Sequence, residues 1–510
     1  MPAFSTKGGM AGREGEHGAM AAKRMIQQGG ETMNGIILAE LVLYCLVMAV
    51  LGYRYGRKEM SHSDFLLGGK KLPGWALAFS ERATGESAWL LLGYTGFVFA
   101  SGLSAIWVAV GIVIGIVCAW LFLADRFRQE AERYGALTLP SYLAKRFGAH
   151  GRTILWLSTV LIFSFMMFYF SAQIAGAGKT LFTVFHIDPK LGMVISVAIV
   201  IMLSYTGGFV SVVWTDMIQS VLMLATLVIL PIVALLEIYS GGLSISAALH
   251  QAKPGLDSWT GGAAGFALGL LLFNNFAWFF GYLGGQPQLS VRFMALKDAR
   301  EAKTAKTVAI IWTLLAYGGA FLIGLAAVAL YQNQSFADVE TVLPHMALDL
   351  LPPWLAGLLL SGILAAIVTT ADSQLLVITS SISEDIVRRS LRLRLSEKQL
   401  VALSRAVVVV AGLLGLVLAM TSESLVYFIV SWAWAGIGCT LSPAILLSFF
   451  WKRYSGVGVI ATIVAGFVST ILWISSPLEA IISSRFATFA IALAAGVLFS
   501  LLFPDRQQAR

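Results

Sequence analysis

Residues 79–89 read FSERATGESAW, and they lie inside an apolar block that runs from residue 73 to residue 100. Most of them are small or polar, and three are charged: Glu81, Arg82 and Glu86. An ionisable side chain at membrane depth costs at least about 2.5–3.5 kcal/mol on insertion scales, so it marks a functional site by default. Such a stretch cannot face lipid. We therefore expect it to face the interior of a helical membrane protein.

The composition of the whole chain agrees with this expectation. Of its 510 residues, 58% are hydrophobic and only 12% are charged, whereas about a quarter of the residues in soluble domains are charged. The apolar blocks of about 20 residues or more can cross a bilayer as helices. They exclude a soluble enzyme, and also a β-barrel built from alternating strands of about ten residues. The sequence has no P-loop, so ATP-driven transport has no support.

The apolar blocks predict an all-α polytopic protein with about thirteen spans. Their approximate limits are residues 35–56, 73–100, 104–124, 152–184, 191–209, 212–240, 262–284, 304–331, 353–383, 401–420, 423–450, 456–475 and 480–503. We expect residues 1–34 to be a disordered tail, because they lack the apolar core of a signal peptide. Residues 35–503 would form the membrane domain, and residues 504–510 a cytoplasmic tail.

Lysine and arginine are distributed unevenly among the connections between spans. We consider alternate connections, starting with the one after the first span and including the C-terminal tail. Together they hold 26 of the 35 Lys and Arg residues. The opposite set holds little beyond Lys190, Lys253 and Arg485. Because basic connections remain in the cytoplasm, this pattern predicts a cytoplasmic C-terminus. With an odd number of spans, the N-terminus would lie outside.

The ninth span contains a second polar stretch, AAIVTTADSQ at residues 365–374. Its residues Ala366, Thr369, Thr370 and Ser373 are spaced by three and four, so they share one helical face. Hydroxyl oxygens beside the carboxylate of Asp372 suit a hard cation such as Na⁺. The alternative is that the hydroxyls only bond to their own backbone. The density of oxygen atoms favours a cation site.

The stretch at residues 79–89 also has two interpretations. It can be an unwound segment whose freed carbonyl groups bind a cation. It can instead be a helix that packs through its small residues, with Arg82 paired to Glu81 or Glu86. The three charges favour the unwound segment.

Further polar residues lie in other spans. Asp216 is either part of a site or an ordinary carboxylate at a helix N-terminus, and Lys179 can extend its amine to the interface. The seventh span and its exit mix amides, aromatic residues and glycines before a proline. This pattern predicts a broken helix that lines a cavity, with an aromatic interface belt as the alternative. The residues are Asn274, Asn275, Trp278, Tyr282, Gly284, Gly285, Gln286 and Pro287.

At these residues the chain resembles the sodium/solute symporter family, and most closely its bacterial sodium/proline symporters. The matching stretches are DFLLGG at 64–69, SAWLL at 87–91, LTLPSY at 137–142, GGF at 207–209 with WTD at 214–216, GQP at 285–287 with RFMA at 292–295, and SWAWAG at 431–436. The resemblance covers about residues 35–500. It implies a leucine-transporter-type fold, in which the second to eleventh helices form two inverted five-helix repeats. It also implies a multi-pass protein of the bacterial inner (plasma) membrane.

The resemblance further implies which residues bind the transported ion and the solute. The ion is Na⁺, and no organic cofactor is expected. Its ligands would be the carbonyl groups of Ala83, Glu86 and Ala366 and the hydroxyl groups of Thr369 and Thr370. A further Na⁺ position in some members would lie near Asp216, Thr369, Asp372 and Ser373. The solute would pack against Trp89, Tyr169, Trp278 and Tyr282, with Gln286 nearby.

The chain departs from the sodium/proline symporters around the cation site. Those proteins carry an aspartate important for Na⁺ where this chain has Gly85, and they lack the charges of Glu81, Arg82 and Glu86. They usually have a neutral residue at the position of Asp372. We hypothesise that Asp372 or Glu86 takes over the missing charge, with Glu81 and Arg82 as candidates for coupling. The competing hypothesis is that a carboxylate carries a proton and that coupling is to H⁺.

The sequence thus predicts a sodium-coupled secondary active symporter, not an enzyme, that imports a small organic solute, foremost L-proline. Its expected partners are this solute and the lipid bilayer, with no nucleic acid and no obligate protein partner. One alternative is a sodium or proton symporter for another amino acid, a carboxylate or a sugar. The others are a membrane sensor that uses the same fold, and a passive channel.

Overall fold

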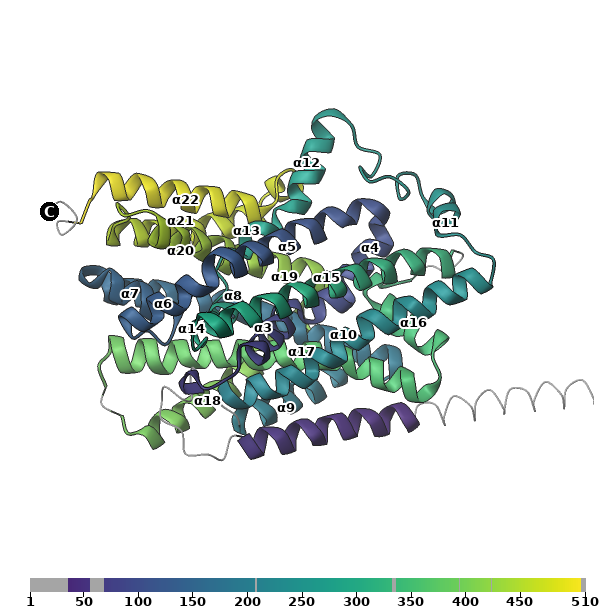
Figure 1. Cartoon of the computed structure of the whole chain (residues 1–510), viewed down its shortest axis with the longest axis horizontal. Helices are drawn as coiled ribbons and strands as arrows, with labels where there is room; N and C mark the ends of the chain where they lie inside the picture. The colour runs from purple at the N-terminus through teal and green to yellow at the C-terminus, as the bar shows by residue number, and fades with distance from the viewer. Residues whose placement is uncertain are drawn as a thin grey trace, which may run out of the picture.

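The computed structural model describes residues 35–55, 68–206, 209–332, 336–393, 395–422 and 424–505. The predicted N-terminal tail, residues 1–34, lies outside the described residues, as do residues 506–510 of the predicted C-terminal tail. The described parts of the chain form helices and connections without a β-strand. Most of the long helices run in roughly the same direction, as in a membrane bundle (Figure 1).

The helices match the predicted spans. Ten helical stretches in the described residues are long and apolar enough to cross a membrane. One of them, Gly74–Tyr134, has 61 residues and contains two of the predicted spans, and two shorter apolar helices, Pro189–Tyr205 and Gly265–Gly281, match two more. Each of the thirteen predicted spans therefore corresponds to an apolar helix, and the all-α prediction is confirmed.

Ten of these spans form two consecutive sets of five. The first set consists of α3 (Gly74–Ala88) with α4 (Thr95–Ser101), α5 (Ile106–Cys118) with α6 (Ala124–Tyr134), α8 (Gly151–Phe185), α9 (Pro189–Thr206) and α10 (Phe209–Ser240). The second consists of α12 (Gly265–Phe276) with α13 (Trp278–Gly281) and α14 (Pro287–Met294), then α15 (Ala299–Leu330), α17 (Pro353–Ser380), α18 (Glu397–Thr421), and α19 (Val426–Trp434) with α20 (Thr440–Phe450). Since five is odd, the second set enters the membrane from the opposite side, which makes it an inverted repeat.

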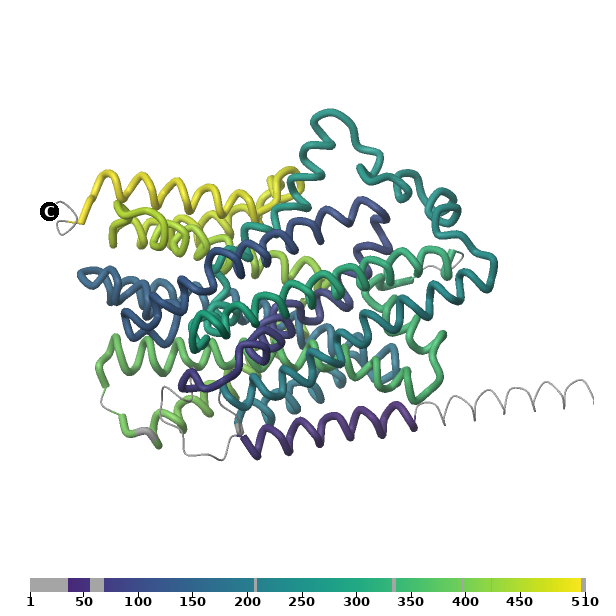
Figure 2. The backbone as a smooth tube through the Cα atoms, viewed as in Figure 1, coloured from purple at the N-terminus to yellow at the C-terminus, as the bar shows by residue number. Residues whose placement is uncertain are grey.

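The remaining helices surround this core. The helix Gly35–Tyr55 precedes it, and α21 (Gly456–Ile474) and α22 (Ser484–Leu502) follow it. Helix Gly35–Tyr55 and the pair α21 and α22 lie at opposite edges of the bundle (Figure 1). Three short helices, α7 (Leu139–Arg146), α11 (Ile245–Ala252) and α16 (Val342–Leu350), belong to connections. The connection that contains α11 leaves the bundle at one end before the chain returns through α12 (Figure 2).

The first helix of the first repeat is interrupted at one residue. Ser87 has φ 54° and ψ −171°, so the helix that begins at Gly74 ends its regular geometry at Glu86. The amide of Ala88 donates to Oε1 of Gln173 on α8, at 3.1 Å, and the amide of Trp89 donates to Oγ of Ser87, at 3.0 Å. The prediction of an unwound segment over residues 79–89 was thus too wide. The small residues of α3 permit contact with α10, α15 and α17 without unwinding.

The first helix of the second repeat is interrupted more fully. Between α13 and α14 the chain passes through Gly284, whose φ is 87°, a value that favours glycine. A Cβ atom on the next residue, Gly285, would lie 2.2 Å from the carbonyl oxygen of Gly438. The two glycines therefore allow both the turn and the close approach to the tenth helix of the core, as the sequence pattern predicts.

Candidate functional site

Oxygen atoms of α3 and α17 meet next to the break at Ser87. Oγ1 of Thr369 lies 3.3 Å from the carbonyl oxygen of Ala83 and 3.1 Å from that of Ala366. Oγ1 of Thr370 lies 3.1 Å from the carbonyl oxygen of Thr84. Both threonines are fully buried. The structure therefore brings four of the five predicted primary sodium ligands, those of Ala83, Ala366, Thr369 and Thr370, into one place.

The fifth predicted ligand, the carbonyl of Glu86, lies at the break itself. It accepts the amide of Trp89 across the distorted turn. The two threonine hydroxyls now donate to carbonyl groups, but a hydroxyl can rotate and turn a lone pair toward a cation. The set contains only neutral oxygens, which is a ligand type that suits a hard monovalent cation.

Arg292 lies where the resemblance implies a second Na⁺. Its Nη2 atom donates to Oδ2 of Asp216, at 3.0 Å, to Oγ of Ser373, at 2.7 Å, and to Oγ1 of Thr84, at 3.0 Å. Its Nε atom donates to Oγ of Ser80, at 3.1 Å. The guanidinium is fully buried. A positive charge of the chain itself therefore contacts Asp216 and Ser373, two of the residues predicted to hold that second ion.

The sequence pattern does not single out Arg292, because residue 292 falls in the connection between the predicted seventh and eighth spans. Helix α14 begins at Pro287, directly after the break, and carries Arg292 into the core. The alternative role of Asp216 as an N-terminal cap is wrong. Asp216 lies about two turns inside α10, which begins at Phe209, and it is fully buried.

Asp372 lies next to this cluster. Arg292 reaches α17 through Ser373, and Asp372 forms no ion pair in the described part of the chain. Asp372 follows Thr369 by three residues, so the two lie on the same side of α17. The carboxylate of Asp372 interacts electrostatically with Arg292 and lies near Ser204 on α9. Its part in cation binding stays a prediction.

The charges of Glu81, Arg82 and Glu86 form one buried network. Arg82 donates through Nε and Nη2 to both carboxylate oxygens of Glu81, and through Nη1 to Oε1 of Glu86, at 2.8 Å. Oε2 of Glu86 accepts the hydroxyl of Tyr317 on α15. Nε1 of Trp120 donates to Glu81 at 3.1 Å. Both ion pairs expected for a packed helix are thus present, and two carboxylates share one guanidinium.

This network occupies the side chain of Glu86, whereas the hydroxyls of Thr369 and Thr370 bond to backbone carbonyl groups. A cavity of about 10 Å³ beside it is lined by Glu81, Arg82, Tyr282 and Gln286, among others. Tyr282 and Gln286 are two of the predicted solute-binding residues. The coupling candidates and the predicted solute site are therefore neighbours.

Aromatic side chains from four core helices form a cluster on the other side of the break. The ring centroids of Trp89 and Trp278 lie 4.5 Å apart, and those of Tyr282 and Trp434 lie 4.2 Å apart. Trp434 also lies 6.4 Å from Tyr169 and 6.1 Å from Trp278. All four predicted aromatic residues come together. Trp434, at their centre, was missed as a site residue, although its motif had been noted.

Several hydrogen-bond donors in and around this aromatic cluster are buried without an acceptor. They are Nε1 of Trp89 and Nε2 of Gln173 and Gln286. The hydroxyl of Tyr169 and Nε1 of Trp278 and Trp434 meet no acceptor in good geometry, although Tyr169 lies near Ser87 and Trp434, and Trp278 lies near Tyr427. Buried donors without partners are rare and costly in folded proteins. Because the indole of Trp89 and the two side-chain amide nitrogens can only donate, this arrangement favours a ligand with acceptor oxygens.

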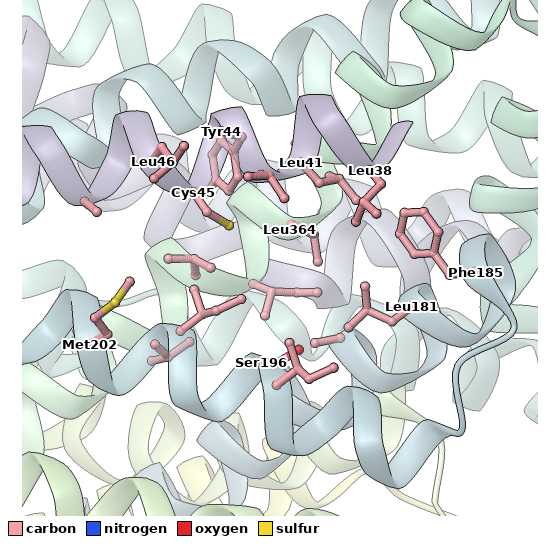
Figure 3. A pocket seen from close by; sticks show the side chains of 18 of the residues that line it. Leu38, Leu41, Tyr44, Cys45, Leu46, Leu181, Phe185, Ser196, Met202 and Leu364 are labelled. Atoms are coloured by element: carbon pink, nitrogen blue, oxygen red, sulfur yellow. The ribbon is translucent and has the colours of Figure 1, made fainter. Parts of the chain in front are cut away.

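A larger cavity, of about 320 Å³, lies elsewhere between helix Gly35–Tyr55, α8, α9 and α17 (Figure 3). Its lining is almost entirely apolar, with side chains such as Leu41, Leu181, Met202 and Leu364 around it. It has no set of polar groups to orient a solute. The polar cluster at the two helix breaks is therefore the candidate functional site.

Lys179, near the C-terminal end of α8, is ion-paired and does not simply extend to the interface. Its amine lies 2.8 Å from Asp338 and also contacts Glu340. The carboxylate of Glu340 in turn accepts the amides of Val426 and Tyr427, at 2.9 and 2.8 Å. These bonds link the start of α19 to α8, at one end of the aromatic cluster.

Two inverted repeats with interrupted first helices, arranged around a polar site, define a leucine-transporter-type secondary transporter. The chain belongs to the sodium:solute symporter family, whose profile matches residues 65–466. It is 34% identical to the high-affinity proline transporter PutP of Bacillus subtilis, over 91% of this chain and 97% of that protein. It is 31% identical to the sodium/proline symporter of Escherichia coli, over 86% of this chain and 87% of that protein.

Solved structures support the fold. The structure of a Na⁺-coupled sialic acid symporter in a substrate-bound, outward-open state superimposes with a TM-score of 0.77 at 20% identity, and covers 92% of this chain and 99% of that one. The nucleobase-cation-symport transporter Mhp1 in a closed conformation gives a TM-score of 0.54 at 14% identity, over 88% and 98% of the two chains. The predicted family and fold are therefore confirmed, and the protein is a multi-pass membrane transporter.

Proposed function

We propose that this protein is a sodium-coupled symporter of a small organic solute that carries a carboxylate, foremost L-proline. One observation carries the proposal: the α3–α17 oxygen set and the aromatic cluster with its unpaired donors lie on either side of the break at Ser87. A cation and a solute bound there would contact consecutive turns of the same helix. The names of the relatives, which include several proline transporters, agree with this choice.

The cation site consists of the carbonyl groups of Ala83, Glu86 and Ala366 and the hydroxyl groups of Thr369 and Thr370. In this proposal Na⁺ joins α3 to α17 and fixes the break. Arg292 fills the second position, where it neutralises Asp216 and contacts Ser373. None of the primary ligands then supplies the carboxylate that sodium/proline symporters carry at the position of Gly85. Because Arg292 fills the second position, we expect one Na⁺ per cycle.

The solute site consists of Trp89, Tyr169, Trp278, Tyr282 and Gln286, together with Trp434. The aromatic faces would bury the pyrrolidine ring, and the unpaired donors would receive the carboxylate. Binding is reciprocal, so Na⁺ raises the affinity for solute by the same factor as solute raises the affinity for Na⁺. Inward movement of Na⁺ gains about 2.3 kcal/mol per 100 mV of membrane potential.

We further propose the orientation in the bacterial plasma membrane, with the N-terminus outside and the C-terminus in the cytoplasm. The uneven distribution of Lys and Arg supports it. On this orientation the starts of α19 and α22 face outside. The ion pairs of Lys179 with Asp338 and Glu340 then lie on the outer side of the solute site.

Uptake of radiolabelled L-proline into proteoliposomes tests the function. An inward Na⁺ gradient should drive accumulation above the external concentration, whereas an equal K⁺ gradient should not. A proton gradient imposed without Na⁺ tests whether H⁺ is the coupling ion instead. If neither gradient drives accumulation of proline, of another amino acid, of a carboxylate or of a sugar, then the symport proposal is wrong.

A further inference from the structure

Arg485 is a buried guanidinium whose two terminal nitrogens bond to neutral oxygens. It lies in the first turn of α22, outside the ten-helix core, and it is 7% exposed. Nη1 donates to Oγ of Ser431 on α19, and Nη2 donates to the carbonyl oxygen of Asn274 on α12, at 3.0 Å. Its Nε atom has no acceptor. Among the described residues, no carboxylate forms an ion pair with it.

The arginine borders the predicted solute site. Its guanidinium carbon lies 4.4 Å from the ring centroid of Trp278, in a cation–π contact. The ring of Trp278 also lies 4.5 Å from that of Trp89, between centroids. The positive charge therefore lies at the edge of the aromatic cluster, beside donors that also have no acceptor.

Electrostatics make this an unfavourable place for a lone cation. A buried charge without a counter-charge is costly. The first turn of a helix carries partial positive charge, which disfavours a second positive group there. The nearby carboxylate of Glu479 attracts the guanidinium electrostatically but forms no ion pair with it, and it accepts the amide of Ser484, at 2.7 Å, and the hydroxyl of the same residue. An incoming carboxylate could accept from Nε and pair directly with the guanidinium.

We propose that Arg485 is a specificity-determining residue that pairs with the carboxylate of the solute and directs it onto Trp278. The proposal rests on the proposed function and deepens it, because it restricts the solutes to those with a carboxylate. A planar guanidinium can bind a carboxylate through two parallel hydrogen bonds. Neutral solutes such as sugars and amides would leave the charge unpaired and be excluded.

The experiment compares L-proline with L-prolinamide, in which a neutral amide replaces the carboxylate. Both compounds compete with radiolabelled L-proline for Na⁺-driven uptake into proteoliposomes that contain the full chain. In the wild type, proline should compete at least about tenfold better than prolinamide, as expected for loss of a charged hydrogen bond. In Arg485→Gln this preference should fall about tenfold or disappear.

Two further variants make the result specific. Arg485→Lys keeps the charge without the planar fork, so it should keep the preference while its affinity for proline falls. Arg453→Gln removes an exposed arginine after α20 and should behave as the wild type. An unchanged preference in Arg485→Gln overturns the proposal. If that variant does not fold, an unchanged proline affinity in Arg485→Lys overturns it instead.

The two proposals fail in different ways. If the wild type shows Na⁺-driven proline uptake and Arg485→Gln keeps the wild-type preference, only the role of Arg485 is wrong. Arg485 would then be a structural contact between α22, α19 and α12. If the wild type transports no solute with a Na⁺ gradient, the proposed function fails together with this role.

Discussion

Arg292 and Asp216 form an ion pair of 3.0 Å in the core of the protein, between α14 and α10. Both side chains are nearly inaccessible to solvent. The same guanidinium nitrogen also donates to Thr84 on α3 and to Ser373 on α17. One positive group thus connects four helices that belong to both repeats.

Loss of this arginine should destabilise the fold. Arg292→Gln leaves Asp216 buried without its counter-charge, with only the hydroxyls of Ser80 and Thr84 as donors, and breaking a buried ion pair costs about 3–5 kcal/mol. We expect a lower melting temperature of the purified protein in detergent and little transport. The double variant Asp216→Asn/Arg292→Gln should regain much of the thermal stability, because no unpaired charge remains. A wild-type melting temperature for Arg292→Gln would contradict the structure.

The threonine hydroxyls should determine the affinity for Na⁺. Thr369→Ala and Thr370→Ala each remove one ligand oxygen, so the KM for Na⁺ should rise about tenfold or more, with a smaller effect on uptake at saturating Na⁺. The serine variants keep the oxygen and should stay close to the wild type. Asp372→Asn tests the carboxylate on the same helix. Because neither threonine hydroxyl bonds to Asp372, we expect the KM for Na⁺ to change by less than about twofold. A large rise there would show that Asp372 belongs to the site, as the sequence suggested.

Gly85 offers a test of the charge network. A Cβ atom there would lie 3.4 Å from Leu289 and 3.5 Å from Nη2 of Arg82, which is ordinary contact distance. Gly85→Ala should therefore be tolerated. Gly85→Asp would place a third carboxylate beside one guanidinium, and we expect uptake to fall at least about tenfold, because an unpaired buried charge is costly. Adding Glu86→Gln removes one of the competing carboxylates and should restore part of the uptake. If uptake is not restored, the carboxylates of the network are not the reason why Gly85→Asp reduces uptake.

Gln173 should stabilise the break at Ser87. Gln173→Ala leaves the amide of Ala88 without its acceptor, a loss of about 1–3 kcal/mol for a buried donor. We expect a lower melting temperature and weaker Na⁺ binding, since the carbonyl of Glu86 lies next to the break. Thr180→Ala on the same helix removes a hydroxyl that donates only to the carbonyl of Gly176, and it serves as the control. Equal behaviour of the two variants would exclude a specific role for Gln173.

Much of the fold and part of the site could be predicted, because they depend on local spacing. Apolar block length determines the spans, and the three- and four-residue spacing of Ala366, Thr369 and Thr370 places their oxygens on one face. The glycines before Pro287 indicate a break, because few other residues adopt the required backbone. These inferences need no knowledge of neighbouring helices.

The remaining features depend on contacts between distant segments. The local sequence around a basic residue near the end of a span is the same whether its side chain faces the cytoplasm or the protein core. The sequence therefore assigns Arg292 to a connection. Arg485 was grouped with loop charges for the same reason. The exact place of the break at Ser87 depends on Gln173, which comes from another helix. The motif around Trp434 is visible in the sequence, but the role of Trp434 depends on four aromatic residues from three other spans.

The position of α22 has a consequence for the modularity of the transporter. Although this helix packs at the periphery, Arg485 in its first turn contacts Trp278 of the proposed solute site. If α21 and α22 were replaced by those of a relative, the residues at the edge of the solute site would change. The selectivity could therefore be altered without a substitution in the two repeats.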